Sequence, residues 1–142
     1  MSRLLVIGCG GVASVAIHKC CQLSEVFTEL CIASRTKSKC DALKKELETK
    51  TSTKITTAQL DADHVDEIIA LINSYKPDAV LNVALPYQDL TIMDACLATK
   101  VSYIDTANYE CENTDDPEWR KVYEERCKSC LLYTSPSPRD RQ

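Results

Sequence analysis

The chain is short of glycine, of long apolar runs and of positive charge. Only three of its 142 residues are glycine. No apolar run approaches the roughly 18 residues that a membrane-spanning helix needs, so we expect no membrane association. The formal net charge is −4, which argues against a nucleic-acid partner because such proteins are usually basic. The apolar stretch after Arg3 is shorter than the roughly 7–15 residues of a signal-peptide core, so we expect a cytoplasmic protein.

Cysteine, by contrast, is abundant, with nine residues. Most of these cysteines fall inside segments of regular apolar spacing, where cysteine often acts as a small core residue. We therefore expect reduced, buried thiols rather than a disulfide framework, and no metal site. The cysteines concerned are Cys9, Cys20, Cys21, Cys31, Cys40 and Cys96.

The last residues differ from the rest in composition. Cys127 and Cys130 have CxxC spacing, but from Cys130 the sequence "CLLYTSPSPRDRQ" shows no periodicity. One set of codons for residues 130–140 reproduces the transposon-end adapter used in tagmentation sequencing. We therefore expect 130–142 to be a disordered, non-native read-through and 1–129 to be an incomplete domain of a longer protein. The CxxC pair then loses its second cysteine.

Apolar periodicity predicts strands and helices in strict alternation. The composition, 44% hydrophobic and 27% charged, is that of one globular domain. Expected strands lie at 3–7, 29–34, 54–60, 79–85 and 101–105. Expected helices lie at 12–23, 38–47 (Ser38 as N-cap), between Asp63 as N-cap and Pro77, at 90–99 and at 117–127; the first buries Val12, Val15, Ala16, Cys20 and Leu23. This order predicts an α/β fold: a Rossmann-type, doubly wound parallel sheet with helices on both faces.

All three glycines lie in "VIGCGGVA", between the first strand and the first helix. Gly8, Gly10, Gly11 and Ala13 fit the pattern GxGxxG/A in the context that makes it informative. Gly8 permits the tight turn, Gly10 lets a pyrophosphate approach the backbone, and Ala13 keeps the helix close to the sheet. The helix start at Gly11 and Val12 offers free N–H groups to the pyrophosphate. The alternative is an ordinary strand-to-helix turn.

The tip of the second strand indicates which dinucleotide binds. An NAD site usually has an acidic residue there for the ribose 2′-OH, whereas an NADP site offers hydroxyl and basic groups to the 2′-phosphate. This chain has Ser34, Arg35 and Lys37 and no acid. NADP is therefore favoured, with a solvated basic loop as the alternative.

Later strand ends extend the expected crevice. Asp61 and Ala62 end the third strand, where adenine usually lies. The fourth strand leads into an apolar loop that contains Ala84, Leu85 and Pro86 and suits the ribose and nicotinamide.

The fifth strand ends in Asp105 and Thr106, which are candidates to face the substrate. Asp105 has the alternative role of accepting hydrogen bonds from loop amides. We expect structural or solvated roles for His18 and His64.

Longer segments carry a more specific resemblance. "LLVIGCGGVASVAIHKC", "NVALPYQDLTIMDAC" and "YIDTANYE" resemble the N-terminal part of saccharopine-dehydrogenase-type reductases, and among these the carboxynorspermidine (carboxyspermidine) synthase branch, over residues 3–128. The resemblance implies NADPH-dependent reduction of the imine formed between aspartate semialdehyde and a diamine, in polyamine biosynthesis. It implies cofactor contacts for Gly8, Gly10, Gly11, Ser34 and Arg35, and a nicotinamide border at 84–86.

In such reductases the substrate-binding and dimerising domain follows the first five strands. The resemblance therefore implies a homodimeric parent protein and a chain that binds NADPH without turnover. Two alternatives remain: another saccharopine-dehydrogenase-like or homoserine-type NADP-dependent reductase, and a dinucleotide-binding module without catalysis.

Overall fold

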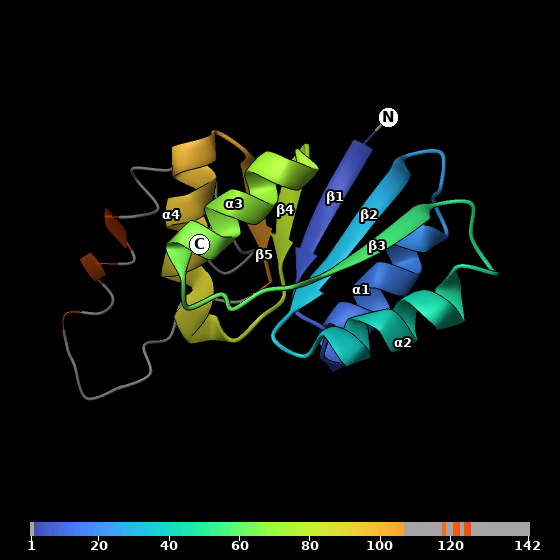
Figure 1. The fold of residues 1–142 in the computed structure, drawn as a ribbon. Helices are drawn as coiled ribbons and strands as arrows, with labels where there is room; N and C mark the ends of the chain where they lie inside the picture. Colours follow the sequence, from blue (N-terminus) through green and yellow to red (C-terminus); the bar gives the residue numbers. More distant parts are fainter. Residues whose placement is uncertain (1, 107–117, 119–120, 123, 126–142) are drawn as a thin grey trace, which may run out of the picture.

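The computed structural model describes residues 2–106, 118, 121–122 and 124–125. The expected tail at 130–142 and most of the expected helix at 117–127 lie outside the described residues. The described part alternates strands and helices as predicted (Figure 1). The elements are β1 (Ser2–Ile7), α1 (Gly11–Cys21), β2 (Phe27–Ser34), α2 (Lys37–Leu47), β3 (Lys54–Gln59), α3 (Val65–Tyr75), β4 (Ala79–Asn82), a 3-10 turn η1 (Pro86–Gln88), α4 (Asp89–Thr99) and β5 (Ser102–Asp105).

The five strands form one parallel sheet in the order β3-β2-β1-β4-β5. Helices α1 and α2 cover one face of this sheet and α3 and α4 cover the other (Figure 1). The sheet order reverses at β1, so the carboxyl ends of β1 and β4 border the crevice where ligands of such sheets bind. The predicted doubly wound fold is confirmed.

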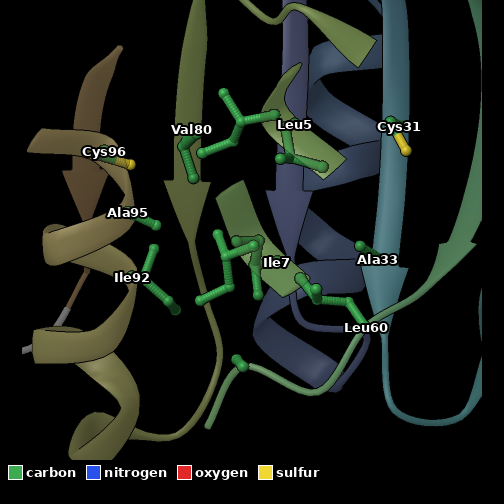
Figure 2. Close-up of a cluster of buried hydrophobic side chains, with 12 residues drawn as sticks. Leu5, Ile7, Cys31, Ala33, Leu60, Val80, Ile92, Ala95 and Cys96 are labelled. Carbon is green, nitrogen blue, oxygen red and sulfur yellow. The ribbon is translucent and has the colours of Figure 1, made fainter. Parts of the chain in front are cut away.

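Strand β1 supplies both halves of the core because successive side chains point to opposite faces. Leu4 and Val6 pack with the residues of α1 and α2. Leu5 and Ile7 pack with those of α3 and α4, and Figure 2 shows Ile92 of α4 turned toward them. A strand covered on both faces has no polar side, which explains the unbroken apolar run at the start of the chain.

The buried face of α1 differs from the prediction. The helix buries Ala13, Ile17 and Cys21 against the sheet. Val12 and Val15, expected in the core, are 64% and 63% exposed. Both sets recur with helical spacing, so periodicity alone does not show which one faces the sheet. The glycine turn before α1 decides the matter by bringing Ala13, whose side chain is small, against β1.

Two expected helix caps are also wrong. The N-cap of α2 is Thr36 rather than Ser38, because the Ser34 hydroxyl accepts the Thr36 N–H and turns the chain earlier. The N-cap of α3 is His64 and makes no side-chain cap, while the Asp63 carboxylate accepts a hydrogen bond from Gln88 Nε2 at 2.8 Å.

The fourth strand is shorter than expected. It ends at Asn82, paired with Asp105 of β5, instead of at residue 85. Val83 still donates its N–H to the Ile7 carbonyl at 2.9 Å. Beyond Val83 the chain leaves the sheet and forms a loop at the edge where the glycine turn also lies.

The burial expected of the six cysteines named above is confirmed for four of them. All six are free thiols; Cys21, Cys31, Cys40 and Cys96 are buried, and Cys9 and Cys20 are partly buried. Among the described residues, no helix has the length and apolar character to cross a membrane. The same residues contain no cluster of three side chains suited to a metal ion.

Gly8→Ala is expected to lower the free energy of unfolding by about 2 kcal/mol or more. Gly8 has φ +121°, and a Cβ there would lie 2.6 Å from the Val83 carbonyl oxygen. Gly10→Ala is the matched control, since its Cβ would meet nothing within 4 Å; we expect a cost below about 1 kcal/mol. Urea denaturation followed by circular dichroism measures both. Equal losses would contradict the role of Gly8.

Candidate cofactor site

The site is organised by the turn that follows β1. Gly8 donates its N–H to the Ala33 carbonyl of β2 at 2.9 Å, and its Cα lies under the carbonyl of Val83 beyond β4. This close approach of backbone to backbone leaves no room for a side chain. The turn therefore joins the ends of three neighbouring strands.

Helix α1 begins directly above this turn and is open to an anion. Its N-cap, Gly10, has an extended backbone and makes no side-chain cap, and its first turn contains no acidic residue. No atom lies within 4 Å of the Cβ positions of Gly10 and Gly11. The first N–H groups of a helix have no partner within the helix, and the helix dipole favours negative charge there. The glycine turn 8–10 and the first residues of α1 together form a pyrophosphate cradle.

The thiol of Cys9 lies within this cradle. Burial, followed by the neighbouring Cys40, raises the pKa of Cys9 to about 11. Cys9 consequently stays protonated at neutral pH and adds no negative charge beside the phosphate position.

A cavity of about 310 Å³ extends from the glycine turn across the carboxyl ends of the strands. Among the residues expected to bind the cofactor, it brings together Gly8, Gly10, Ser34, Arg35, Ala62, Ala84 and Leu85. Its lining also includes Val83, which belongs to the expected apolar loop, and residues that the sequence reasoning missed, namely Ile7, Cys9, Thr36, Lys39, Leu60 and Gln88. Gly11, Val12, Lys37, Asp61 and Pro86 do not line it, and the roles assigned to individual residues stay predictions.

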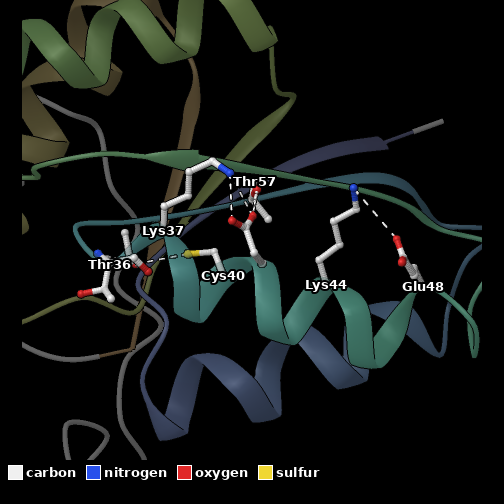
Figure 3. A network of polar contacts seen from close by, with 8 residues as sticks. Thr36, Lys37, Cys40, Lys44, Glu48 and Thr57 are labelled. Atoms are coloured by element: carbon white, nitrogen blue, oxygen red, sulfur yellow. Dashed lines mark hydrogen bonds and ion pairs between the residues drawn. The ribbon is translucent and has the colours of Figure 1, made fainter.

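The basic residues that follow β2 differ from one another in their surroundings. Lys37 forms an ion pair with Asp41 one helical turn away, at 2.9 Å (Figure 3). Asp41 also accepts a hydrogen bond from the Thr57 hydroxyl. That hydrogen bond and then the Lys37 ammonium lower the pKa of Asp41. Lys39 instead lines the cavity with Arg35. Two basic residues, Arg35 and Lys39, therefore line the cavity, and Lys37 does not.

Two other residues expected to contact the cofactor, Ser34 and Asp61, form hydrogen bonds within the protein. The Ser34 hydroxyl donates to the Thr36 carbonyl at 3.1 Å. Asp61 lies in a neighbouring hollow with Arg35, Gln59 and Glu67, and its carboxylate accepts the Asp63 N–H at 3.1 Å. Arg35 borders both spaces, so its guanidinium is placed to bridge them.

A buried polar cluster lies behind the apolar loop at 83–86. Asn82 and Asp89 are each 2% exposed. Asn82 Nδ2 donates to Asp89 Oδ1 at 2.6 Å and to the Tyr103 hydroxyl at 3.0 Å. Tyr103 in turn donates to Asp105 Oδ2 at 2.9 Å. Asp105 therefore belongs to this cluster, while Thr106 is exposed beyond the end of β5.

The carboxyl groups of this cluster have raised pKa values. Burial, followed by the charge of Asp105, raises the pKa of Asp89 to about 7. Burial likewise raises the pKa of Asp105. Asp89 Oδ2 has no hydrogen-bond partner among the described residues, which adds to the cost of ionising this group.

The two histidines lie outside the cavity. His18 contacts the Ser14 carbonyl at 2.7 Å and Glu46 at 3.2 Å on the outer side of α1. His64 is exposed, 3.8 Å from Asp61. These positions agree with structural or solvated roles.

A parallel sheet ordered 3-2-1-4-5, with a glycine turn and an open helix N-terminus at its switch point, defines a dinucleotide-binding domain. Residues 4–129 match the family described as the saccharopine dehydrogenase NADP binding domain. The chain belongs to this family, and its cofactor is NADP.

Named relatives agree with this assignment. The chain is 43% identical over 134 residues to carboxyaminopropylagmatine dehydrogenase of Synechocystis sp., covering 93% of this chain and 33% of that protein. It is 38% identical over 109 residues to carboxynorspermidine synthase of Vibrio cholerae, covering 73% of this chain and 26% of that protein. The chain thus spans about a third or less of the length of these relatives.

Solved structures share the fold at low identity. Saccharopine dehydrogenase (L-Glu forming) of Saccharomyces cerevisiae superposes with a TM-score of 0.66 and 16% identity, covering 86% of this chain and 24% of that chain. At this identity the likeness supports the fold alone.

Lys39→Ala is expected to weaken NADPH binding about fivefold, the equivalent of about 1 kcal/mol, because it removes a cation from the cavity lining. Lys37→Ala is the matched control and is expected to change the Kd by less than about twofold, since Lys37 is paired with Asp41. Titration of NADPH fluorescence measures both. A larger effect of Lys37→Ala would contradict this assignment.

Asp89 makes stability depend on pH. Its pKa rises from 3.8 to about 7 on folding, so its stabilisation is fully present below pH ~4 and is lost as the pH rises through ~7. Asp89→Asn carries no charge at any pH. Between pH 8 and pH 5, wild type should gain on the order of 2 to 3 kcal/mol relative to the variant.

Urea denaturation at a series of pH values measures this difference. Asp66→Asn removes the same charge from the first turn of α3 and serves as the matched control. A pH-independent difference between wild type and Asp89→Asn would contradict the raised pKa.

Proposed function

We propose that this chain is the NADPH-binding part of a reductase that converts the imine of aspartate semialdehyde and an amine into a carboxylated polyamine. The observation that carries this proposal is the joint match of the NADP-binding family and of relatives named for carboxylated polyamine products. The Synechocystis relative carries agmatine in its name, so the amine is either a diamine or agmatine. The whole protein is proposed to form a homodimer through parts beyond the matched domain.

The arrangement of the cavity suits this chemistry. NADPH, when bound, supplies the hydride. A protonated imine is already electrophilic, so the protein mainly has to position the reactants and exclude water. The cradle at Gly10 would hold the pyrophosphate, and Arg35 and Lys39 would face the adenosine phosphate. Ala84 and Leu85 would form an apolar wall along the nicotinamide.

The substrate side is proposed to lie outside this chain. The described cavity carries basic groups only near the end of β2, and the apolar wall offers no charged partner for the carboxylate or ammonium groups of the imine. The chain spans 33% of the length of its Synechocystis relative. We therefore propose that the chain as it stands binds NADPH and does not turn over.

Fluorescence titration with NADPH and NADH tests the first part of this proposal. We expect at least about tenfold tighter binding of NADPH, equivalent to about 1.4 kcal/mol from the 2′-phosphate contacts. NADH binding as tightly as NADPH would overturn it.

Turnover is tested by following NADPH absorbance with aspartate semialdehyde and either a diamine or agmatine. No consumption is expected from this chain alone. Imine reduction by the purified chain would show that substrate recognition resides here and would overturn the division proposed above.

A further inference from the structure

The strongest unexplained feature of the fold is the buried polar side chain of Asn82 within an otherwise apolar strand. Asn82 is the last residue of β4 and lies at the carboxyl end of the sheet, where the cavity is. An unpaired buried amide is costly, so its hydrogen bonds show what it is held against. Asn82 is 2% exposed. Its side chain forms hydrogen bonds with partners on α4, on β5 and in the loop after β4.

These contacts allow only one orientation of the amide. Both Nδ2 hydrogens are used, toward Asp89 Oδ1 on α4 and the Tyr103 hydroxyl on β5. Asn82 Oδ1 accepts the N–H of Ala84 at 2.9 Å. A flipped amide would turn its oxygen toward the Asp89 oxygen and its NH₂ toward the Ala84 N–H. The Ala84 N–H can only donate, so the amide oxygen has to face it, and Asp89 on α4 and Tyr103 on β5 accept the two Nδ2 hydrogens on the other side.

The amide in turn holds the wall of the cavity. Ala84 and Leu85 both line it. The Ala84 N–H is bound by Asn82, and the Leu85 carbonyl accepts the Gln88 N–H at 2.9 Å. The loop is thus fixed at two successive residues, by the Asn82 side chain at Ala84 and by the 3-10 turn η1 at Leu85.

The same segment also touches the glycine turn. Val83 donates its N–H to the Ile7 carbonyl at 2.9 Å, and its own carbonyl oxygen lies 2.6 Å from the Cβ position of Gly8. A displacement of the loop at Ala84 would therefore move the apolar wall. Through Val83 it would also move the pyrophosphate cradle at Gly8.

We propose that Asn82 is a positioning residue for the nicotinamide half of the cofactor site, with Asp89 and Tyr103 holding its amide by accepting both Nδ2 hydrogens. The inference rests on the proposed function for which half of NADPH lies beside Ala84 and Leu85. It assigns no contact between Asn82 and the cofactor. Asn82 acts through the backbone of the loop.

Two ligands of different length separate this role from a general structural one. NADPH contains the nicotinamide half, whereas adenosine 2′,5′-bisphosphate contains only the adenosine half. With the full chain, Asn82→Ala should weaken NADPH binding at least about fivefold and change the affinity for adenosine 2′,5′-bisphosphate by less than about twofold. The amide exchange of Ala84, followed by NMR, should speed up relative to the core strands.

Three further variants control for folding. Tyr103→Phe removes one acceptor and should give the same ligand pattern at smaller amplitude, so the test does not depend on Asn82→Ala remaining folded. Asp89→Asn keeps an acceptor for Asn82 and should retain NADPH affinity within about twofold. Thr53→Ala removes another buried polar group, which donates to the Phe27 carbonyl at 2.7 Å at the opposite edge of the sheet, and should leave both affinities unchanged.

The outcomes separate this inference from the proposed function. Failure of the wild-type chain to bind NADPH would overturn the proposed function. Wild-type binding together with unchanged NADPH affinity in Asn82→Ala and Tyr103→Phe, or with equal losses for both ligands, would overturn the positioning role alone.

Discussion

The cofactor site depends on one close approach, that of the Gly8 backbone to the Val83 carbonyl. Without a side chain at Gly8, the chain turns sharply out of the central strand and donates its N–H to the neighbouring strand at Ala33. The turn sets where α1 begins, and that start determines which residues of the helix face the sheet. The open N-terminus, the burial of Ala13 and the position of the loop after β4 all follow from this single contact.

The two sides of the cavity differ in their physical character. On the β2 side, charged groups compete for partners, and Lys37 is neutralised by Asp41 while Lys39 faces the cavity. On the β4 side the visible wall is apolar, and its polar support lies behind it. A charged, solvated surface suits recognition of a phosphate, whereas an apolar wall suits the exclusion of water from a hydride transfer.

Much of this arrangement was predictable because it is local. The alternation of strands and helices and the glycine turn are encoded in short stretches, and the structure bears them out. The glycine motif correctly placed Ala13 against the sheet, whereas periodicity did not identify the buried face of α1, since Val12 and Ala13 fit helical spacing equally well in different phases. Which of Lys37 and Lys39 lines the cavity was harder to predict. Lys37 is paired with Asp41 one helical turn away, and this pair exists only once α2 has formed.

The cluster around Asn82 joins three elements, so sequence spacing could not assemble it. It did leave a signal, because a single amide in the run "AVLNVAL" has to find partners when the strand is buried on both faces.

The sheet order also has a consequence for synthesis on the ribosome. Strand β1 is made before β2 and β4, and in the folded sheet it pairs with both. The edge of β1 opposite β2 pairs with β4, and residues 35–78 are synthesised after β2 and before β4. During that interval the central strand of the finished protein is an exposed edge, rich in leucine and valine, the kind of surface that associates with other chains. The strand that later holds the cofactor turn is therefore the one that nascent-chain chaperones would need to shield.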